Sequence, residues 1–125
     1  MYLERLNKMC DFREKITAAG TEEVETQRIL KTLENSDGFI AALDEHGKEF
    51  SSLELANLIS RQKDLGVPVV FVVGGAYGLK DAVLGKAKMK ISLGRMTLPH
   101  ELCKLVFLEQ LYRAHTIIAG SGYHH

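Results

Sequence analysis

Two short segments in the second half of the chain contain the residues best suited by type and spacing to bind a ligand. The first is the run Gly-Gly-Ala-Tyr-Gly at 74–78, which directly follows the apolar run 67–73. Glycines let the backbone approach a ligand closely, and α/β folds bind ligands at the carboxyl ends of central strands. The run has no Gly-Lys-Ser/Thr sequence and does not fit Gly-x-Gly-x-x-Gly. A tight turn is therefore an equally good interpretation of this run taken alone.

The second segment is Leu-Gly-Arg-Met-Thr-Leu-Pro-His at 93–100. It is predicted to link a strand to a helix N-terminus, where amides lack intrahelical partners and could hold a ligand. An ordinary capped helix start is the alternative, which physics alone slightly favours. His100 falls in the first helical turn. Because a helix N-terminus disfavours an imidazolium, a neutral His100 could accept a proton. A surface histidine bonded to backbone is the alternative.

Other candidates lie nearer the end of the chain. Lys104 and Arg113 fall on the last predicted helix, where a solvated face is the simpler interpretation. Tyr123, His124 and His125 could stack on a base or contact phosphate, although chain ends are often unimportant. A metal site in this tail is a weak hypothesis, because a structural zinc needs four protein ligands.

Composition narrows the class of protein. The apolar fraction of 46% favours one globular domain over a disordered chain. The longest apolar run, 67–73, is far shorter than the roughly 20 residues of a membrane span. The N-terminus has no signal-peptide pattern, so we expect a cytosolic chain. Cys10 and Cys103 show no metal-ligand spacing, and we expect neither a disulfide nor a metal.

Charge is unevenly distributed although the formal net charge is zero. Residues 1–73 hold nine Lys and Arg against thirteen Asp and Glu, whereas residues 74–125 hold seven against three. Four of the five histidines also lie in the second part. This asymmetry weakly indicates an anionic partner for the C-terminal part.

The elements that must position these residues alternate between helix and strand. This order predicts an α/β domain with a mostly parallel sheet. We expect 67–73 to be a central strand because it is apolar on both faces, and 44–47 to be a turn that closes the strand 39–43. Inward-facing residues are expected at Val24, Ile29, Leu30 and Leu33, and on the last helix at Leu102, Leu105, Val106, Leu111 and Tyr112. The predicted helices are 2–9, 21–35, 51–66, 81–87 and 100–118, and the predicted strands are 12–16, 39–43, 67–73 and 89–93.

Three stretches together resemble one known family. They are Val-Val-Phe-Val-Val-Gly-Gly-Ala-Tyr-Gly-Leu at 69–79, Ile-Ser-Leu-Gly-Arg-Met-Thr-Leu-Pro-His-Glu-Leu at 91–102, and Glu-Gln-Leu-Tyr-Arg-Ala at 109–114 followed by the terminal Tyr-His-His. Their order and spacing resemble the ribosomal RNA large subunit methyltransferase H family of the SPOUT superfamily. The resemblance covers nearly the whole chain and is strongest from Phe39 onward.

The resemblance implies a single SPOUT domain over 1–125 with a C-terminal trefoil knot, a rare exception to the usual connection rules. It also implies a homodimer that binds S-adenosylmethionine and methylates N3 of a pseudouridine in helix 69 of 23S RNA, on the assembled ribosome. No metal is required. The implied cofactor-binding residues are Leu43, Gly74, Gly75, Gly78, Leu93, Gly94, Arg95, Met96, Thr97 and Leu98. The residues expected to remove the N3 proton or position RNA are His100, Arg113, Tyr123 and His124.

The sequence departs from that family pattern in two places. Family members usually have a further strand and loop of about 20 residues before the helix that begins this chain, and Gly94 stands where they more often have Ser. Three alternatives to this function remain open. They are a SPOUT enzyme acting on transfer RNA or another ribosomal nucleotide, a non-enzymatic nucleotide-binding α/β module, and a histidine-tail metal binder.

Overall fold

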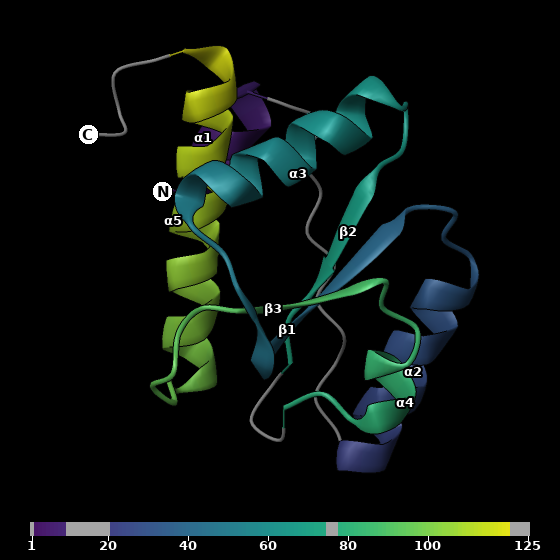
Figure 1. Cartoon of the computed structure of the whole chain (residues 1–125). Coiled ribbons are helices and arrows are strands. Elements are labelled where there is room, and N and C mark those ends of the chain that lie inside the picture. Colours follow the sequence, from purple (N-terminus) through teal and green to yellow (C-terminus); the bar gives the residue numbers. More distant parts are fainter. Residues whose placement is uncertain (1, 10–20, 75–77, 121–125) are drawn as a thin grey trace.

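The computed structural model describes residues 2–9, 21–74 and 78–120, and it shows helices packed around a small sheet (Figure 1). The alternation of elements confirms the predicted α/β class. The strand expected at 12–16 lies outside the described residues. The helices are α1 (Tyr2–Met9), α2 (Glu22–Glu34), α3 (Ser52–Asp64), α4 (Asp81–Leu84) and α5 (His100–Ala119), and the strands are β1 (Phe39–Glu49), β2 (Val69–Val72) and β3 (Met89–Ser92).

The described sheet has three parallel strands in the order β2-β1-β3. The strand in the middle is therefore β1, so the expectation that 67–73 is central is wrong for this part of the chain. The β-branched composition of 67–73 is explained by the helices that pack on both faces of β2 and not by a central place in the sheet. The strand does not end at Leu43 as expected, because β1 runs to Glu49. Residues 44–47 nevertheless form an irregularity within it, since Leu43 and Lys48 both pair with Ile91 and the residues between them pair with neither neighbouring strand.

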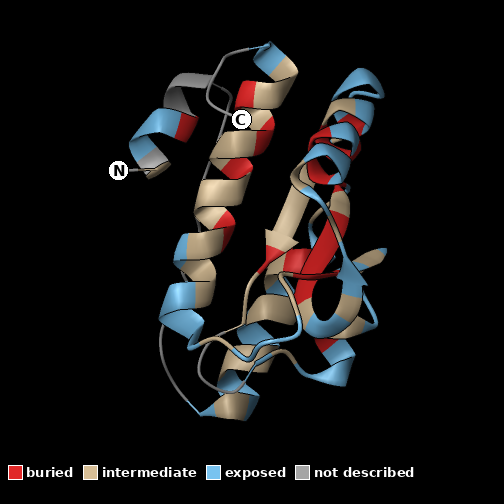
Figure 2. Ribbon diagram, turned by 60° about the vertical axis from the view of Figure 1, so that its left-hand side comes forward, coloured by how far each residue is buried: buried red, intermediate tan, exposed pale blue. Residues whose placement is uncertain are grey.

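Two apolar layers cover the two faces of the sheet. Alternate strand residues such as Ala41 and Ile91 pack with α1, α3 and α5, whereas Ile40 and Val72 pack with α2 and α4. Figure 2 shows the buried residues gathered in the strands and on the sides of the helices that face them. The period of two along β1 thus divides the core into two clusters.

Local capping signals set several helix ends as the sequence predicted. Thr21 Oγ1 accepts a hydrogen bond from the Val24 amide at 3.2 Å. Ser51 and Glu54 form the expected capping box, in which each backbone amide donates to the other residue's side chain, at 3.0 and 3.1 Å. Gly66 follows α3 with a φ of 71°, a conformation that glycine adopts without strain.

On α2 the predicted Leu33 is buried and Ile29 and Leu30 pack against the core, but Val24 is 40% exposed. The inward face of α5 was predicted less well, since Leu102 and Leu105 are 44% and 52% exposed. The residues that α5 buries are instead Phe107, Leu111, Ala114 and Thr116. Leu111 was predicted correctly. Most of α5 is apolar, so periodicity alone does not decide which of its faces meets the sheet.

Candidate functional site at the carboxyl edge of the sheet

The register of the parallel strands brings three predicted ligand-binding segments to one edge of the sheet. Ala42 pairs with Val72, and Leu43 pairs with Ile91. Gly74 follows β2 by two residues, and Leu93 directly follows β3. Since parallel strands end on the same side, Leu43, Gly74 and Leu93 share the carboxyl edge, where α/β folds place ligands.

Gly74 and Gly78, the described glycines of the run after β2, lie close together. A Cβ added to Gly74 would lie 2.7 Å from the carbonyl carbon of Gly78, too close for any side chain. Gly78 itself has a φ of 71°, which favours glycine. Gly75, also expected to bind the cofactor, lies outside the described residues. The two described glycines are therefore required by the fold of this loop, whether or not it binds a ligand.

The loop 93–99 between β3 and α5 is fixed by a turn at its start. The Ser92 hydroxyl donates to the Gly94 carbonyl at 2.8 Å and accepts from the Gly94 amide at 3.1 Å. Gly94 has a φ of 138°, a backbone conformation that strains other residues. A serine at position 94 would be strained in this conformation, so the departure from the family pattern suits the local backbone.

Two polar contacts tie the same loop to the distal part of β1. Thr97 Oγ1 donates to Glu45 Oε2 at 3.2 Å, and Arg95 Nε lies 3.9 Å from Glu49 Oε1. Sequence reasoning missed Glu45 and Glu49, because it ended the strand at Leu43. Both contacts involve exposed side chains and link the irregular end of β1 to the loop.

The side chains of this loop differ in exposure. Leu93 and Leu98 are half-buried, whereas Met96 is 84% exposed and the Arg95 side chain is 95% exposed. The half-buried leucines could contact an apolar ring. The backbone amides and carbonyls of 93–98 are the polar groups suited to hold an adenosine.

His100, the first residue of α5, has a carboxylate beside it. Its Nε2 lies 3.4 Å from Glu101 Oε1, and both side chains are largely exposed. Tyr123 and His124 lie outside the described residues, so the structure does not place them relative to His100. The assignment of a proton acceptor therefore stays a prediction.

Arg113 lies on α5 in a polar network that also reaches α3. Its Nε donates to both Glu109 carboxylate oxygens at 3.1 and 3.2 Å. Gln110 Nε2 donates to Glu109 at 3.1 Å, and Ser52 at the start of α3 donates to Gln110 at 2.6 Å. The spacing of four residues between Glu109 and Arg113 could have revealed this pair from sequence. The link to Ser52 had no sequence signal.

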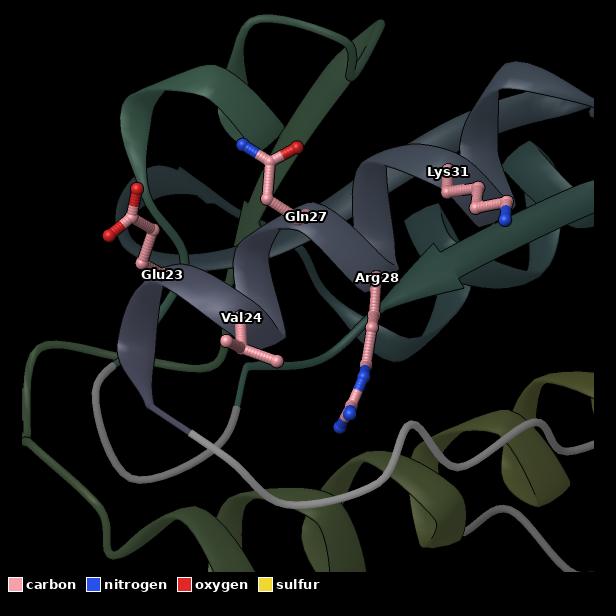
Figure 3. A pocket seen from close by; sticks show the side chains of 5 residues that line it. All are labelled: Glu23, Val24, Gln27, Arg28 and Lys31. Carbon is pink, nitrogen blue, oxygen red and sulfur yellow. The ribbon is translucent and has the colours of Figure 1, made fainter.

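Two surface grooves lie largely away from the carboxyl edge, although Gly78, a predicted cofactor-binding residue, lines the smaller one. A shallow groove of about 360 Å³ runs along α2, where Glu23, Val24, Gln27, Arg28 and Lys31 project from the helix (Figure 3). A smaller groove lies between α2 and the segment Gly78–Val83. Neither groove is lined by Leu43 or by loop 93–99. Within the described ranges, no group of three or more His, Cys, Asp and Glu residues could hold a metal, and none of the described helices could span a membrane.

Comparison with known proteins identifies the family of the chain. The family model described as "Predicted SPOUT methyltransferase" matches residues 1–124. The chain therefore belongs to the SPOUT methyltransferase family.

Curated relatives narrow the family further. The chain is 41% identical to "Ribosomal RNA large subunit methyltransferase H" of Nitratidesulfovibrio vulgaris strain Miyazaki F, over 99% of this chain and 85% of that protein. It is 46% identical to the protein of the same name from Bacteroides thetaiotaomicron, over 83% of this chain and 66% of that protein. With the Maridesulfovibrio salexigens protein of that name the identity is 47%, over 81% and 65%. The chain thus spans about two thirds of the length of the latter two, and it belongs to the ribosomal RNA large subunit methyltransferase H family.

Proposed function

We propose that this chain is an S-adenosylmethionine-dependent methyltransferase of large-subunit ribosomal RNA. The main support for this proposal is the strand register, which puts Leu43, Gly74 and the loop 93–99 at one carboxyl edge of the sheet. The chain also matches the SPOUT methyltransferase family over residues 1–124. The relatives' names indicate the RNA class. We assign N3 of a pseudouridine in helix 69 of 23S RNA as the atom that is methylated, on the assembled ribosome in the cytoplasm.

The residues present at the edge suit this cofactor. A side chain at Gly74 would meet the backbone of Gly78, so a glycine is needed at this position. The half-buried Leu93 and Leu98 offer apolar surface for a purine, and the loop backbone offers hydrogen-bonding groups. S-adenosylmethionine supplies an electrophilic methyl group, and no metal is needed for its transfer.

The protein must then orient the RNA and accept a proton. A target nitrogen has to approach the methyl carbon in line with the departing sulfur, and N3 of pseudouridine carries a proton that must leave. His100 stands at the end of the cofactor loop and is assigned as a candidate acceptor, together with His124. Arg113 and Tyr123 are assigned to position the RNA.

A homodimer and a C-terminal trefoil knot belong to the same proposal. One chain of 125 residues has a limited surface with which to hold a folded RNA. A two-fold partner could complete the site with its own C-terminal tail. Sedimentation equilibrium of the purified chain tests this part, and a strictly monomeric active chain would contradict it.

The proposed function is tested with ribosomes purified from a bacterial strain that lacks this modification. The chain and labelled S-adenosylmethionine should transfer one methyl group per ribosome, and mass mapping should locate it on the pseudouridine of helix 69. Label on transfer RNA or at another ribosomal nucleotide would support a different SPOUT substrate. An absence of cofactor binding by calorimetry would indicate a non-enzymatic module.

A further inference from the structure

Ser92, the last residue of β3, is a polar residue buried at the carboxyl edge of the sheet, and it is 4% exposed. Two other polar residues are buried in the described part of the chain, Gln62 in α3 and Thr116 in α5. The chain passes from Ser92 into the loop 93–99, which leads to the start of α5 (Figure 1). Of these three residues, Ser92 is therefore the one that directly precedes the proposed cofactor loop.

The Ser92 hydroxyl both donates a hydrogen bond to Gly94 and accepts one from it. Its proton is donated to the Gly94 carbonyl oxygen at 2.8 Å, and its oxygen accepts from the Gly94 amide at 3.1 Å. Both distances are typical of well-formed hydrogen bonds. One buried side chain thus engages both backbone polar groups of Gly94, and its only hydroxyl proton is already used within the protein.

The backbone of the loop has few other constraints. Within the described ranges, no hydrogen bond between two backbone groups involves residues 94–98. Two contacts reach the loop from β1, at Thr97 and at Arg95, and both join exposed side chains. Exposed polar contacts stabilise a structure little, because water competes for the same groups. Among the described residues, the buried Ser92 hydroxyl is therefore the main constraint on the shape of the loop.

Gly94 depends on such a constraint. Its φ of 138° lies in a backbone region that other residues rarely adopt. Apart from its chain neighbours, no atom of the described structure lies within 4 Å of the position that a Cβ would take. Since glycine has the greatest conformational freedom of all residues, loss of the Ser92 hydroxyl would allow the start of the loop to adopt other conformations.

We infer that Ser92 is a positioning residue, whose hydroxyl holds the loop 93–98 in the shape that binds S-adenosylmethionine. The inference rests on the proposed function, in which backbone groups of this loop hold the cofactor. Groups that are already oriented bind a ligand without the entropic cost of ordering the loop. Because Ser92 is buried and acts through Gly94, it should set the affinity for the cofactor and leave the chemical step unchanged.

A different role would be structural only, in which the Ser92 hydroxyl stabilises the end of β3. Thr116 has a role of this kind, since its hydroxyl donates to the Arg113 carbonyl oxygen within α5 at 2.7 Å. A structural role predicts that removal of the Ser92 hydroxyl lowers the melting temperature and leaves the cofactor affinity unchanged. Comparison of the two residues therefore separates the two roles.

The test is calorimetry of S-adenosylmethionine binding to Ser92→Ala and Ser92→Thr, with amide hydrogen exchange measured on the same proteins without cofactor. S92A should bind roughly tenfold more weakly, as expected for one lost hydrogen bond, and its exchange should become faster only at residues 93–99. S92T keeps the hydroxyl on a residue that suits a strand, so its affinity should be close to that of wild type. In methyl transfer to ribosomes, S92A should show a KM for the cofactor about tenfold higher and a nearly unchanged kcat.

The control is Thr116→Val, which removes a similarly buried hydroxyl outside the loop. It should lower the melting temperature and keep the cofactor affinity of wild type. Three results would each overturn the inference while the proposed function stands: wild-type affinity in S92A, an equal loss of affinity in T116V, or an equal loss in S92A and S92T at unchanged melting temperature. No cofactor binding by the wild-type chain would instead refute the proposed function, and the inference with it.

Discussion

Gly47 of β1 lies against the backbone of Lys90 of β3, and a Cβ built on Gly47 would stand 2.6 Å from the Lys90 carbonyl carbon. The contact falls where the β1–β3 register shifts between Leu43 and Lys48. Within this irregular stretch, Glu45 accepts the hydrogen bond from Thr97. A glycine at position 47 therefore allows this stretch of β1 to lie close to β3, beside the loop 93–99.

Replacing Gly47 with Val should destabilise the fold. Backbone atoms cannot move aside as a flexible side chain can, so the two strands must separate at the shift. We expect a loss of about 2–4 kcal/mol in the free energy of unfolding, measured by urea denaturation. Lys48→Ala, an exposed neighbour, should change stability by less than about 0.5 kcal/mol. Near-wild-type stability of G47V would contradict the close approach.

Replacing Gly74 with Val should abolish S-adenosylmethionine binding. The new side chain would collide with the Gly78 backbone, 2.7 Å from its carbonyl carbon, and open the loop. Calorimetry measures the affinity. Gly66→Ala serves as the control for general destabilisation. It is strained by a φ of 71° but has open space around it, so it should lose stability and keep cofactor affinity. Cofactor binding by G74V at wild-type affinity would remove this loop from the site.

Glu109 and Arg113 should be energetically coupled. Both side chains are mostly buried, with 19% and 24% exposed, so the loss of one partner leaves the other poorly compensated. Glu109→Gln should cost about 1–2 kcal/mol in unfolding free energy. A double-mutant cycle with Arg113→Met should give a coupling of about 1 kcal/mol. Glu101→Gln, at an exposed position on the same helix, should be nearly neutral, and purely additive effects in the cycle would refute the coupling.

His115 should make stability depend on pH. Burial, and to a lesser degree the charge of Lys63, lowers the pKa of His115. The folded state therefore resists protonation, and its stabilising contribution is complete above the unfolded value of about 6.5 and is lost as pH falls below it. Urea midpoints at pH 7.5 and pH 5.5 should differ less for His115→Gln than for wild type. His46→Gln, at an exposed histidine, should retain the wild-type difference. An unchanged difference in H115Q would contradict the assignment.

Replacing residues of the C-terminal tail, Tyr123 and His124, should lower the rate of methyl transfer and leave the affinity for S-adenosylmethionine nearly unchanged. Tyr123→Ala and His124→Ala should each lower methyl transfer to ribosomes by about 10²-fold or more if they position RNA or move a proton. Their S-adenosylmethionine affinity should stay close to wild type. Wild-type turnover in both variants would exclude the tail from the site.

The sequence predicts some parts of the fold and the site well and others poorly. The order of elements, the Ser51–Glu54 capping box and the two loops at strand ends follow from local patterns, which depend on neighbours in the chain. The central position of β1 did not follow, because β1 and β2 are both apolar and only pairing distinguishes them. The sequence also predicted wrongly that Leu102 and Leu105 face inward. Most of α5 is apolar, so its sequence pattern does not distinguish the buried face from the exposed one.

The sequence by itself determined the α/β class, the candidate loops and the family resemblance, since each depends on residue identity and spacing along the chain. Only the tertiary structure decided that Gly47 lies against the backbone of Lys90 and that Glu45 accepts a hydrogen bond from Thr97. These facts depend on strand register. Register is settled by which faces can be buried together once all the elements are in place.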